Sequence, residues 1–186
     1  MKNSLAGKIL ISSPHIDDPR FEKTVIFICT HNEEGAMGLT INKRLTDLNL
    51  AELLAEPSED ENLERVKLPV FIGGPLEPER GFLLHSSAHN RADSTIVGDN
   101  FGVSGTLDTL KSISSQNELP KDVIFALGYA GWDNGQLEQE LKKDVWLIID
   151  ASKNLVFETD SESLWDTSMS LLGVDPLLLA THTGQA

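Results

Sequence analysis

The pattern of apolar and polar positions along the chain predicts a central strand over Lys23–Thr30. Apolar side chains alternate between its two faces, with Val25, Phe27 and Cys29 on one face and Ile26 and Ile28 on the other. Because both faces are apolar, we expect other elements to cover this strand on both sides. His31–Gly35 is a predicted turn, and Met37–Ile41 returns as the second strand of a hairpin.

Further short apolar runs predict the remaining strands. These runs are Lys8–Ser12, Val70–Gly73, Gly81–His85, Thr95–Gly98, Asp122–Leu127, Val145–Asp150 and Leu155–Phe157. The acidic, polar stretch Pro57–Arg65 is predicted to be an exposed loop.

Apolar residues spaced three and four apart predict helices between the strands. They lie in Leu48–Ala55 with a cap at Thr46 or Asp47, around Leu107, Leu110 and Ile113, in Asn134–Lys142, and around Trp165 and Met169 after a cap at Asp160 or Ser161. Helices and strands alternate irregularly, which favours a mixed sheet. We therefore predict an α+β fold, with residues 1–186 forming one compact domain.

Charge narrows the range of partners. The chain of 186 residues has a formal net charge of −14 and a pI of about 4.6. Proteins that bind nucleic acid usually carry a basic stripe, and anionic membranes attract basic segments. We therefore expect neither direct nucleic-acid binding nor membrane binding. The oligomeric state stays open.

Cys29 is the single cysteine, so an internal disulfide is impossible and a reducing, cytoplasmic location is expected. On an extended strand Cys29 and His31 share a face, and a nearby histidine could activate the thiol. This pair is the candidate centre of a redox sensor or enzyme. The alternative is a small buried apolar residue next to a histidine in a surface turn.

A second candidate is Leu127–Gln136, where a strand is expected to run into a glycine-bearing turn and then a helix. Such a turn can present backbone N–H groups to an anion, but acidic residues near the helix start would repel phosphate. A neutral or aromatic ligand near Tyr129 and Trp132 is the functional interpretation. The structural alternative is a tight turn in which both aromatic rings pack.

His85, beside Ser86, is the third catalytic candidate, although no G-x-S-x-G motif accompanies it. A histidine that simply ends a strand is the competing interpretation. His15, Asp17 and Asp18 include metal-ligand types, but no second half of a site follows at a matching spacing. We therefore expect no metal and no cofactor.

Several blocks taken together resemble the YqgE/AlgH family of bacterial proteins over nearly the whole chain. They are Ser13–Pro14 with Asp18–Phe21, Cys29–Leu39 leading to Ile41–Asn42, Gly73–Pro75, Arg80–Ser86, Leu127–Trp132, Gly135–Glu138 with Glu140, Trp165 and Leu172–Gly173. The resemblance implies one domain whose sheet bends into a barrel-like core flanked by helices. Members are often labelled as transcriptional regulators, a label that names a phenotype and no mechanism.

Four segments, Pro14–Phe21, His31–Asn42, Gly73–Pro75 and Gly128–Gln136, are rich in Gly, Pro, Asn and Asp at strand ends. Folds often place their sites there, so we expect these segments to meet in space. The candidate ligand or partner surface comprises Pro14, Asp18, Asn42, Gly73, Gly74, Tyr129, Trp132, Gln136 and Glu138. The favoured hypothesis is a regulatory or interaction protein with a small-molecule or protein partner at this surface. A redox protein using Cys29 with His31 is the alternative. An enzyme built around His85, Asp18 and the Gly128–Gln136 segment is the third hypothesis.

Overall fold

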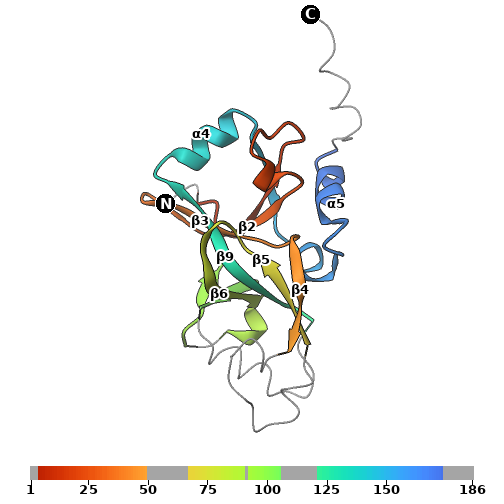
Figure 1. Cartoon of the computed structure of the whole chain (residues 1–186). Coiled ribbons are helices and arrows are strands. Elements are labelled where there is room, and N and C mark those ends of the chain that lie inside the picture. Colours follow the sequence, from red (N-terminus) through yellow and green to blue (C-terminus); the bar gives the residue numbers. More distant parts are fainter. Residues whose placement is uncertain (1–3, 50–66, 91, 106–120, 174–186) are drawn as a thin grey trace, which may run out of the picture.

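One curled sheet forms most of the molecule (Figure 1). The computed structural model describes residues 4–49, 67–90, 92–105 and 121–173. The strands are β1 (Lys8–Ser12), β2 (Val25–Asn32), β3 (Gly35–Thr40), β4 (Arg44–Asn49), β5 (Lys67–Ile72), β6 (Leu76–Ser86), β7 (Thr95–Val97), β8 (Phe101–Ser104), β9 (Val123–Asp133) and β10 (Trp146–Asp150). The helices are α4 (Gln136–Lys142) and α5 (Leu164–Leu171), the 3-10 turns η1 (Pro19–Phe21) and η2 (Ser87–His89), and the π-helical turn η3 (Asn154–Glu158).

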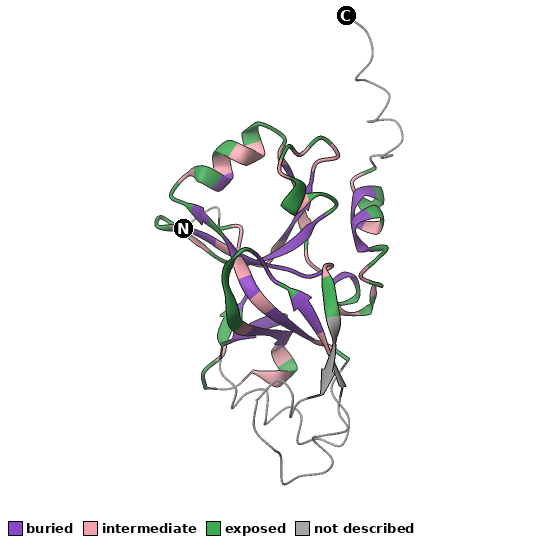
Figure 2. Ribbon diagram, viewed as in Figure 1, coloured by how far each residue is buried: buried purple, intermediate pink, exposed green. Residues whose placement is uncertain are grey.

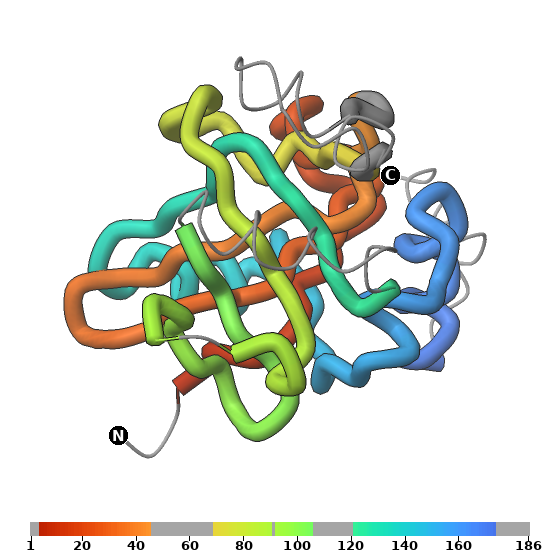
Figure 3. The backbone as a smooth tube through the Cα atoms, turned by 90° about the horizontal axis from the view of Figure 1, so that it is seen from below, coloured from red at the N-terminus to blue at the C-terminus, as the bar shows by residue number. Residues whose placement is uncertain are grey.

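The strands follow the order β10-β1-β2-β3-β9-β6-β8-β7, and β4 and β5 join the sheet beside β9. All pairs are antiparallel except β5 with β9. The sheet curls into a half-barrel (Figure 3), so that a Cβ atom added at Gly7, just before β1, would lie 3.7 Å from Val97 on β7. The predicted α+β domain with a mixed sheet and a barrel-like core is confirmed.

Each face of the sheet carries its own apolar cluster. The central strands between the two clusters are mostly buried (Figure 2). Val25, Phe27 and Cys29 of β2 belong to the cluster that contains α5, whereas Ile26 and Ile28 belong to the cluster that contains Leu137 of α4. The prediction that this strand is central and covered on both sides is therefore confirmed. Burial of its apolar side chains, each worth about 1.5–3 kcal/mol, favours this two-sided arrangement.

β9 connects the two halves of the sheet. Val123–Leu127 pairs with β5 and β6, and Ala130–Asp133 pairs with β3. The strand changes partners around Gly128, whose φ of +72° is a left-handed conformation that favours glycine. The predicted order of strand, glycine-bearing turn and helix is present, with the turn at Asn134–Gly135. The predicted end of the strand at Leu127 is wrong, because hydrogen bonding to β3 keeps the chain extended as far as Asp133.

Two other predicted elements are also wrong. Thr46–Asn49 pairs with β5 as part of β4 instead of starting a helix, and Leu155–Phe157 lies in a π-helical turn instead of a strand. The remainder of the predicted helix at Leu48–Ala55, the loop at Pro57–Arg65 and the helix around Leu110 lie outside the described residues.

The other predicted strands agree with the structure within a few residues at their ends, except that β6 begins earlier, at Leu76. The predicted helices at Asn134–Lys142 and around Trp165 are present as α4 and α5. No helix in the described part of the chain is long and apolar enough to cross a membrane.

Candidate functional site

A cavity of about 480 Å³ lies between α4, β9, β10 and the loop that contains η1. Its wall is formed by three segments of the chain, residues 16–21, 75–76 and 130–146. The lining residues are Ile16, Asp17, Asp18, Arg20, Phe21, Pro75, Leu76, Ala130, Gly131, Trp132, Gln136, Glu140, Lys143, Val145 and Trp146. The volume is in the range of pockets that hold small organic molecules.

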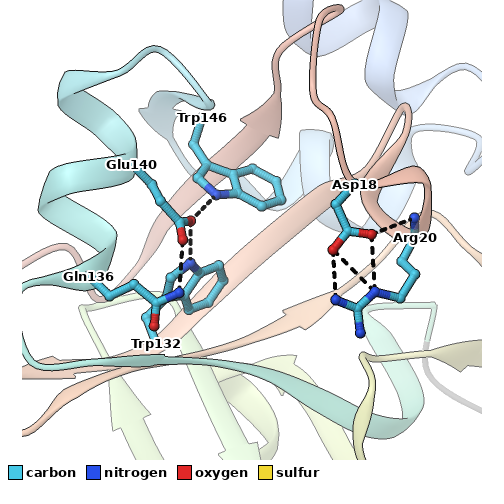
Figure 4. Close-up of polar contacts among 6 residues, drawn as sticks. All are labelled: Asp18, Arg20, Trp132, Gln136, Glu140 and Trp146. Atoms are coloured by element: carbon cyan, nitrogen blue, oxygen red, sulfur yellow. Dashed lines mark hydrogen bonds and ion pairs between the residues drawn. The ribbon is translucent and has the colours of Figure 1, made fainter.

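Glu140 organises one side of the cavity (Figure 4). Its Oε2 accepts hydrogen bonds from Nε1 of Trp132 at 2.9 Å and from Nε1 of Trp146 at 2.7 Å. Its Oε1 accepts a third bond, of 2.8 Å, from Nε2 of Gln136. Gln136 and Glu140 are four positions apart on α4, so they face the same side of the helix. One carboxylate therefore fixes two indole rings from different strands.

Three aromatic rings of the cavity wall meet edge to face. The centroids of Trp132 and Trp146 are 6.0 Å apart with an interplanar angle of 82°, and those of Phe21 and Trp146 are 5.5 Å apart at 75°. Both indoles are nearly buried, with 7% and 3% of their surface exposed. Edge-to-face contacts of this kind stabilise a fixed ring orientation.

Asp18 and Arg20 form the opposite side of the cavity (Figure 4). Asp18 caps η1 by accepting the backbone N–H of Arg20, and Pro19 provides a fixed φ at the first position of the turn. The Arg20 guanidinium donates through Nε and Nη2 to both carboxylate oxygens, the shortest contact being 2.7 Å. These hydrogen bonds from Arg20 lower the pKa of Asp18, so the carboxyl stays ionised near neutral pH.

Three of the predicted surface residues, Asp18, Trp132 and Gln136, line this cavity. Gly73 and Gly74 are buried behind it against β9, where a Cβ atom on Gly74 would come within 2.1 Å of the backbone of Tyr129. These two glycines therefore permit close strand contact and do not line the wall.

The other predicted surface residues have separate positions. Asn42 accepts the N–H of Val25 and donates to the carbonyl of Lys23, which joins the ends of β2 and β3. Tyr129 donates its hydroxyl to Glu77. Pro14 lies in the loop after β1 and is not among the cavity residues.

His31 and Glu138 form a second, separate group. Nε2 of His31 lies 2.8 Å from Oε1 of Glu138, and Nδ1 of His31 accepts the N–H of Leu5 at 3.0 Å. Because Nδ1 accepts, the imidazole proton is on Nε2 and points to the carboxylate. The Glu138 carboxylate accepts a hydrogen bond from its own backbone and another from His31, and both lower its pKa.

Cys29 does not share a site with His31. A bulge in β2 opposite β3 falls between Ile28 and Thr30, so the simple alternation of faces ends at Cys29. Cys29 lies in the cluster that contains α5, whereas His31 contacts α4. Burial raises the pKa of the Cys29 thiol to about 12. The hypothesis that the two residues are neighbours on one face is therefore wrong, and the alternative of Cys29 as a small buried residue agrees with the structure.

His85 is fully buried in a polar network near η2. Its Nδ1 donates to the carbonyl of Ser86 at 2.9 Å, so Nε2 is the acceptor for the hydroxyls of Ser104 at 3.1 Å and Ser94 at 3.3 Å. Ser104 is also buried. This network satisfies polar groups in the core and lies away from the cavity.

Sequence reasoning missed Glu140 and Trp146 as site residues. A signal for Glu140 was available in its four-residue spacing from Gln136 on the predicted helix. Trp146 begins a strand whose pairing with β1 only the fold reveals. Among the described residues, no group of three His, Cys, Asp or Glu side chains could hold a metal ion.

Comparison with known proteins places this architecture among bacterial relatives. A model of the family described as AlgH-like matches residues 9–177. A UPF0301 protein of Caulobacter vibrioides is 42% identical over 183 residues, which cover 98% of this chain and 94% of the relative. A UPF0301 protein of Ruegeria pomeroyi is 44% identical over 186 residues, covering 98% and 99%.

Two solved structures have the same fold. The solution structure of the AlgH protein from Pseudomonas aeruginosa matches with a TM-score of 0.77 at 33% identity, covering 100% of this chain and 98% of that one. A crystal structure of a Corynebacterium diphtheriae protein matches with a TM-score of 0.72 at 21% identity, covering 95% and 91%. The second similarity concerns the fold alone.

Proposed function

This chain belongs to the AlgH-like family, and we propose that it acts as a regulatory protein that binds a small organic molecule in the cavity between Trp132 and Asp18. The observation that carries the proposal is the cavity itself. Its volume of about 480 Å³ suits a small ligand, and aromatic rings with a few charged groups line it, as in many ligand sites.

The construction of the cavity supports a regulatory role. Its walls come from the η1 loop, from Pro75 and Leu76 at the start of β6, and from the continuous stretch β9–α4–β10, and these three segments are distant from one another in sequence. A ligand that contacts all three segments would stabilise their relative positions, and such differential stabilisation is how a ligand shifts a conformational equilibrium. The bound and free proteins would then present different surfaces to a partner.

The chemistry of the lining favours binding over catalysis. None of the described lining residues is a Ser, Thr, Cys or His, the residue types that usually supply nucleophiles. A general acid needs a raised pKa, whereas Arg20 lowers the pKa of Asp18.

The redox alternative requires a reactive Cys29. Burial raises the pKa of this thiol to about 12, which leaves almost no thiolate at neutral pH. His31, the partner required to activate it, is hydrogen bonded to Leu5 and Glu138 instead. These contacts favour the ligand-binding hypothesis over the thiol hypothesis.

Native mass spectrometry of the protein purified from its host tests the proposal. We expect a retained small molecule in the wild type, and its loss in Leu76→Trp, which places a larger side chain in the cavity wall. Leu76 is 44% exposed, so this change does not alter the core. Ile96→Trp is the matched control because Ile96 is 68% exposed and is not among the lining residues. Equal ligand retention in both variants would contradict the proposed site.

A further inference from the structure

His85, Ser94 and Ser104 form a polar cluster that has no part in the cavity, because none of the three residues lines it. We propose that Ser94 is a nucleophile with His85 as its general base, and that Ser94 accepts the acyl group of an activated ester. This site is a second one, and its chemistry does not depend on ligand binding in the cavity.

Strand register brings the three side chains of the cluster to one face of the sheet. His85 on β6 is paired with Gly102 on β8, and Gly102 is paired with Ile96 on β7. Ser104 and Ser94 lie two positions from Gly102 and Ile96, so their side chains point to the same face as that row. The hydroxyl oxygens of the two serines are 2.9 Å apart. Residues of β6 and β8 and the residue just before β7 therefore meet at one point of this face.

Gly102 lets the imidazole of His85 extend across β8. A Cβ atom at this glycine would lie 2.5 Å from Cε1 and 3.1 Å from Nδ1 of His85, so the ring occupies the space that a side chain would take. Nε2 of His85 is consequently 3.3 Å from the hydroxyl oxygen of Ser94 and 3.1 Å from that of Ser104. Any larger residue at position 102 would keep the histidine from reaching Ser94.

The hydrogen bonds of His85 leave Nε2 in the form that a general base requires. Nδ1 donates to the carbonyl of Ser86, so Nε2 of the neutral imidazole carries no proton. In sites with a serine nucleophile, a third group holds the histidine in this same tautomer, with Nε2 toward the hydroxyl. Ser104 is buried, whereas Ser94 is half-buried, so Ser94 is the serine that a substrate can reach.

The reaction assigned to Ser94 is an acyl transfer. Oγ of Ser94 forms a bond to the ester carbonyl carbon, and the bond from that carbon to the alcohol oxygen breaks. Nε2 of His85 takes the serine proton and gives it to the departing alkoxide. Ile96, two positions further along and 68% exposed, offers an apolar contact to the hydrocarbon part of the acyl group.

Reaction of the purified protein with p-nitrophenyl acetate tests this proposal. We expect an initial burst of p-nitrophenolate together with acetylation of Ser94, located by mass spectrometry of peptides. Ser94→Ala should abolish the burst, and His85→Gln should slow acetylation of Ser94 at least about a hundredfold, because a general base typically contributes that much. Ser170→Ala, which removes an exposed hydroxyl on α5, is the control and should leave the burst unchanged.

Replacement of the nucleophile by cysteine gives a measurement that does not depend on the folding of His85→Gln. In Ser94→Cys, proton transfer to Nε2 of His85 favours the thiolate, as in other cysteine–histidine pairs. Iodoacetamide should therefore alkylate this thiol at neutral pH at least about tenfold faster than the thiol of Ser170→Cys. The buried Cys29 should react slowly in both variants.

Any one of three results would overturn the proposal. They are a burst that survives in Ser94→Ala, acetylation of Ser94 no faster than that of Ser170 in the wild type, and equal alkylation rates in Ser94→Cys and Ser170→Cys. The cluster around His85 would then serve only to satisfy polar groups in the core. None of these results bears on the cavity, whose ligand is tested separately by native mass spectrometry.

Discussion

Nε1 of Trp146 donates a 2.7 Å hydrogen bond to Oε2 of Glu140, which connects the first residue of β10 to the fifth residue of α4, six positions earlier in the chain. The same oxygen accepts the indole N–H of Trp132 on β9. Glu140 therefore holds two nearly buried donors that have no other hydrogen bond to the described residues. Stability and site geometry depend on the same carboxylate.

Replacement of Glu140 by leucine should destabilise the protein markedly. Both indole N–H groups would lose their acceptor, and each unsatisfied buried donor costs about 1–3 kcal/mol. We expect the free energy of unfolding, measured by urea denaturation, to fall by about 2–4 kcal/mol. Glu140→Gln retains an acceptor and should cost less than half as much. Equal losses in the two variants would show that charge matters more than the hydrogen bonds.

Cys29 should react slowly with a thiol reagent in the native protein at neutral pH. The pKa of about 12 reflects burial, which disfavours the thiolate that such reagents attack. Absorbance during labelling with an aromatic disulfide gives the rate directly, and labelling in denaturant provides the reference for the unfolded chain. Fast native labelling with a midpoint clearly below the ordinary value of about 8.5 would revive the redox hypothesis.

The stability contributed by Asp122 should disappear in acid. Burial alone would raise the pKa of this carboxyl, but hydrogen bonds from Ser86 and His89 outweigh it, and the folded-state pKa is lowered. A lowered folded-state pKa stabilises the native state above the unfolded value, and this contribution is lost as pH falls through the folded value. Asp122→Asn should therefore cost about 1 kcal/mol at pH 7, after allowance for the partial exposure of Asp122, and almost nothing near pH 2.

Urea unfolding at several pH values measures this difference. Asp133→Asn, which makes the same charge change at an exposed side chain, is the control. A constant difference between wild type and Asp122→Asn from pH 7 to pH 2 would be inconsistent with the ionised form of Asp122 being the stabilising one.

Gly128→Ala should weaken the connection between the two halves of the sheet. Gly128 has a φ of +72°, and an added Cβ atom would lie 2.5 Å from the carbonyl oxygen of Gly74. Strain and this clash together should lower the free energy of unfolding by about 3 kcal/mol. Gly105→Ala is the control, because no described atom lies within 4 Å of the added Cβ, and it should change stability by less than about 0.5 kcal/mol.

The protein should have no measurable affinity for duplex DNA at physiological salt. Its formal net charge of −14 repels a phosphate backbone, and nucleic-acid binding depends strongly on cationic contacts. Fluorescence anisotropy of labelled duplexes provides the test, with measurement at low salt as the more sensitive condition. A sequence-specific gel shift with the purified protein would show that the transcriptional label of the family describes direct contact.

The sequence by itself determined the elements that the local pattern of apolar side chains is enough to identify. The short apolar run in Lys8–Ser12 and the two apolar faces of Lys23–Thr30 identify β1 and β2, because every second side chain of a strand faces the same side. The spacing of Leu137 and Leu141 identifies α4 for the equivalent helical reason. Blocks spread along the whole chain also indicated the family and, through it, the barrel-like core.

Tertiary structure decided the segments whose local pattern is ambiguous. Thr46–Asn49 becomes a strand because β5 lies beside it, and Ala130–Asp133 stays extended because β3 does. The bulge at Cys29 separates this residue from His31, and no local pattern indicates where a bulge will fall. In each case the hydrogen-bonding partner lies elsewhere in the chain, so local propensity is only a weak guide.

The residues of the cavity also divide into those that the sequence indicated and those that only the fold brings together. Asp18, Trp132 and Gln136 could be selected from the sequence because aromatic and polar residues at predicted strand and helix ends often form sites. Their assembly with Glu140 and Trp146 around one space could not, because it depends on the sheet bringing β10 next to β1 and α4 across β9. Sequence patterns specify which face of an element is buried, whereas long-range packing decides which elements face one another.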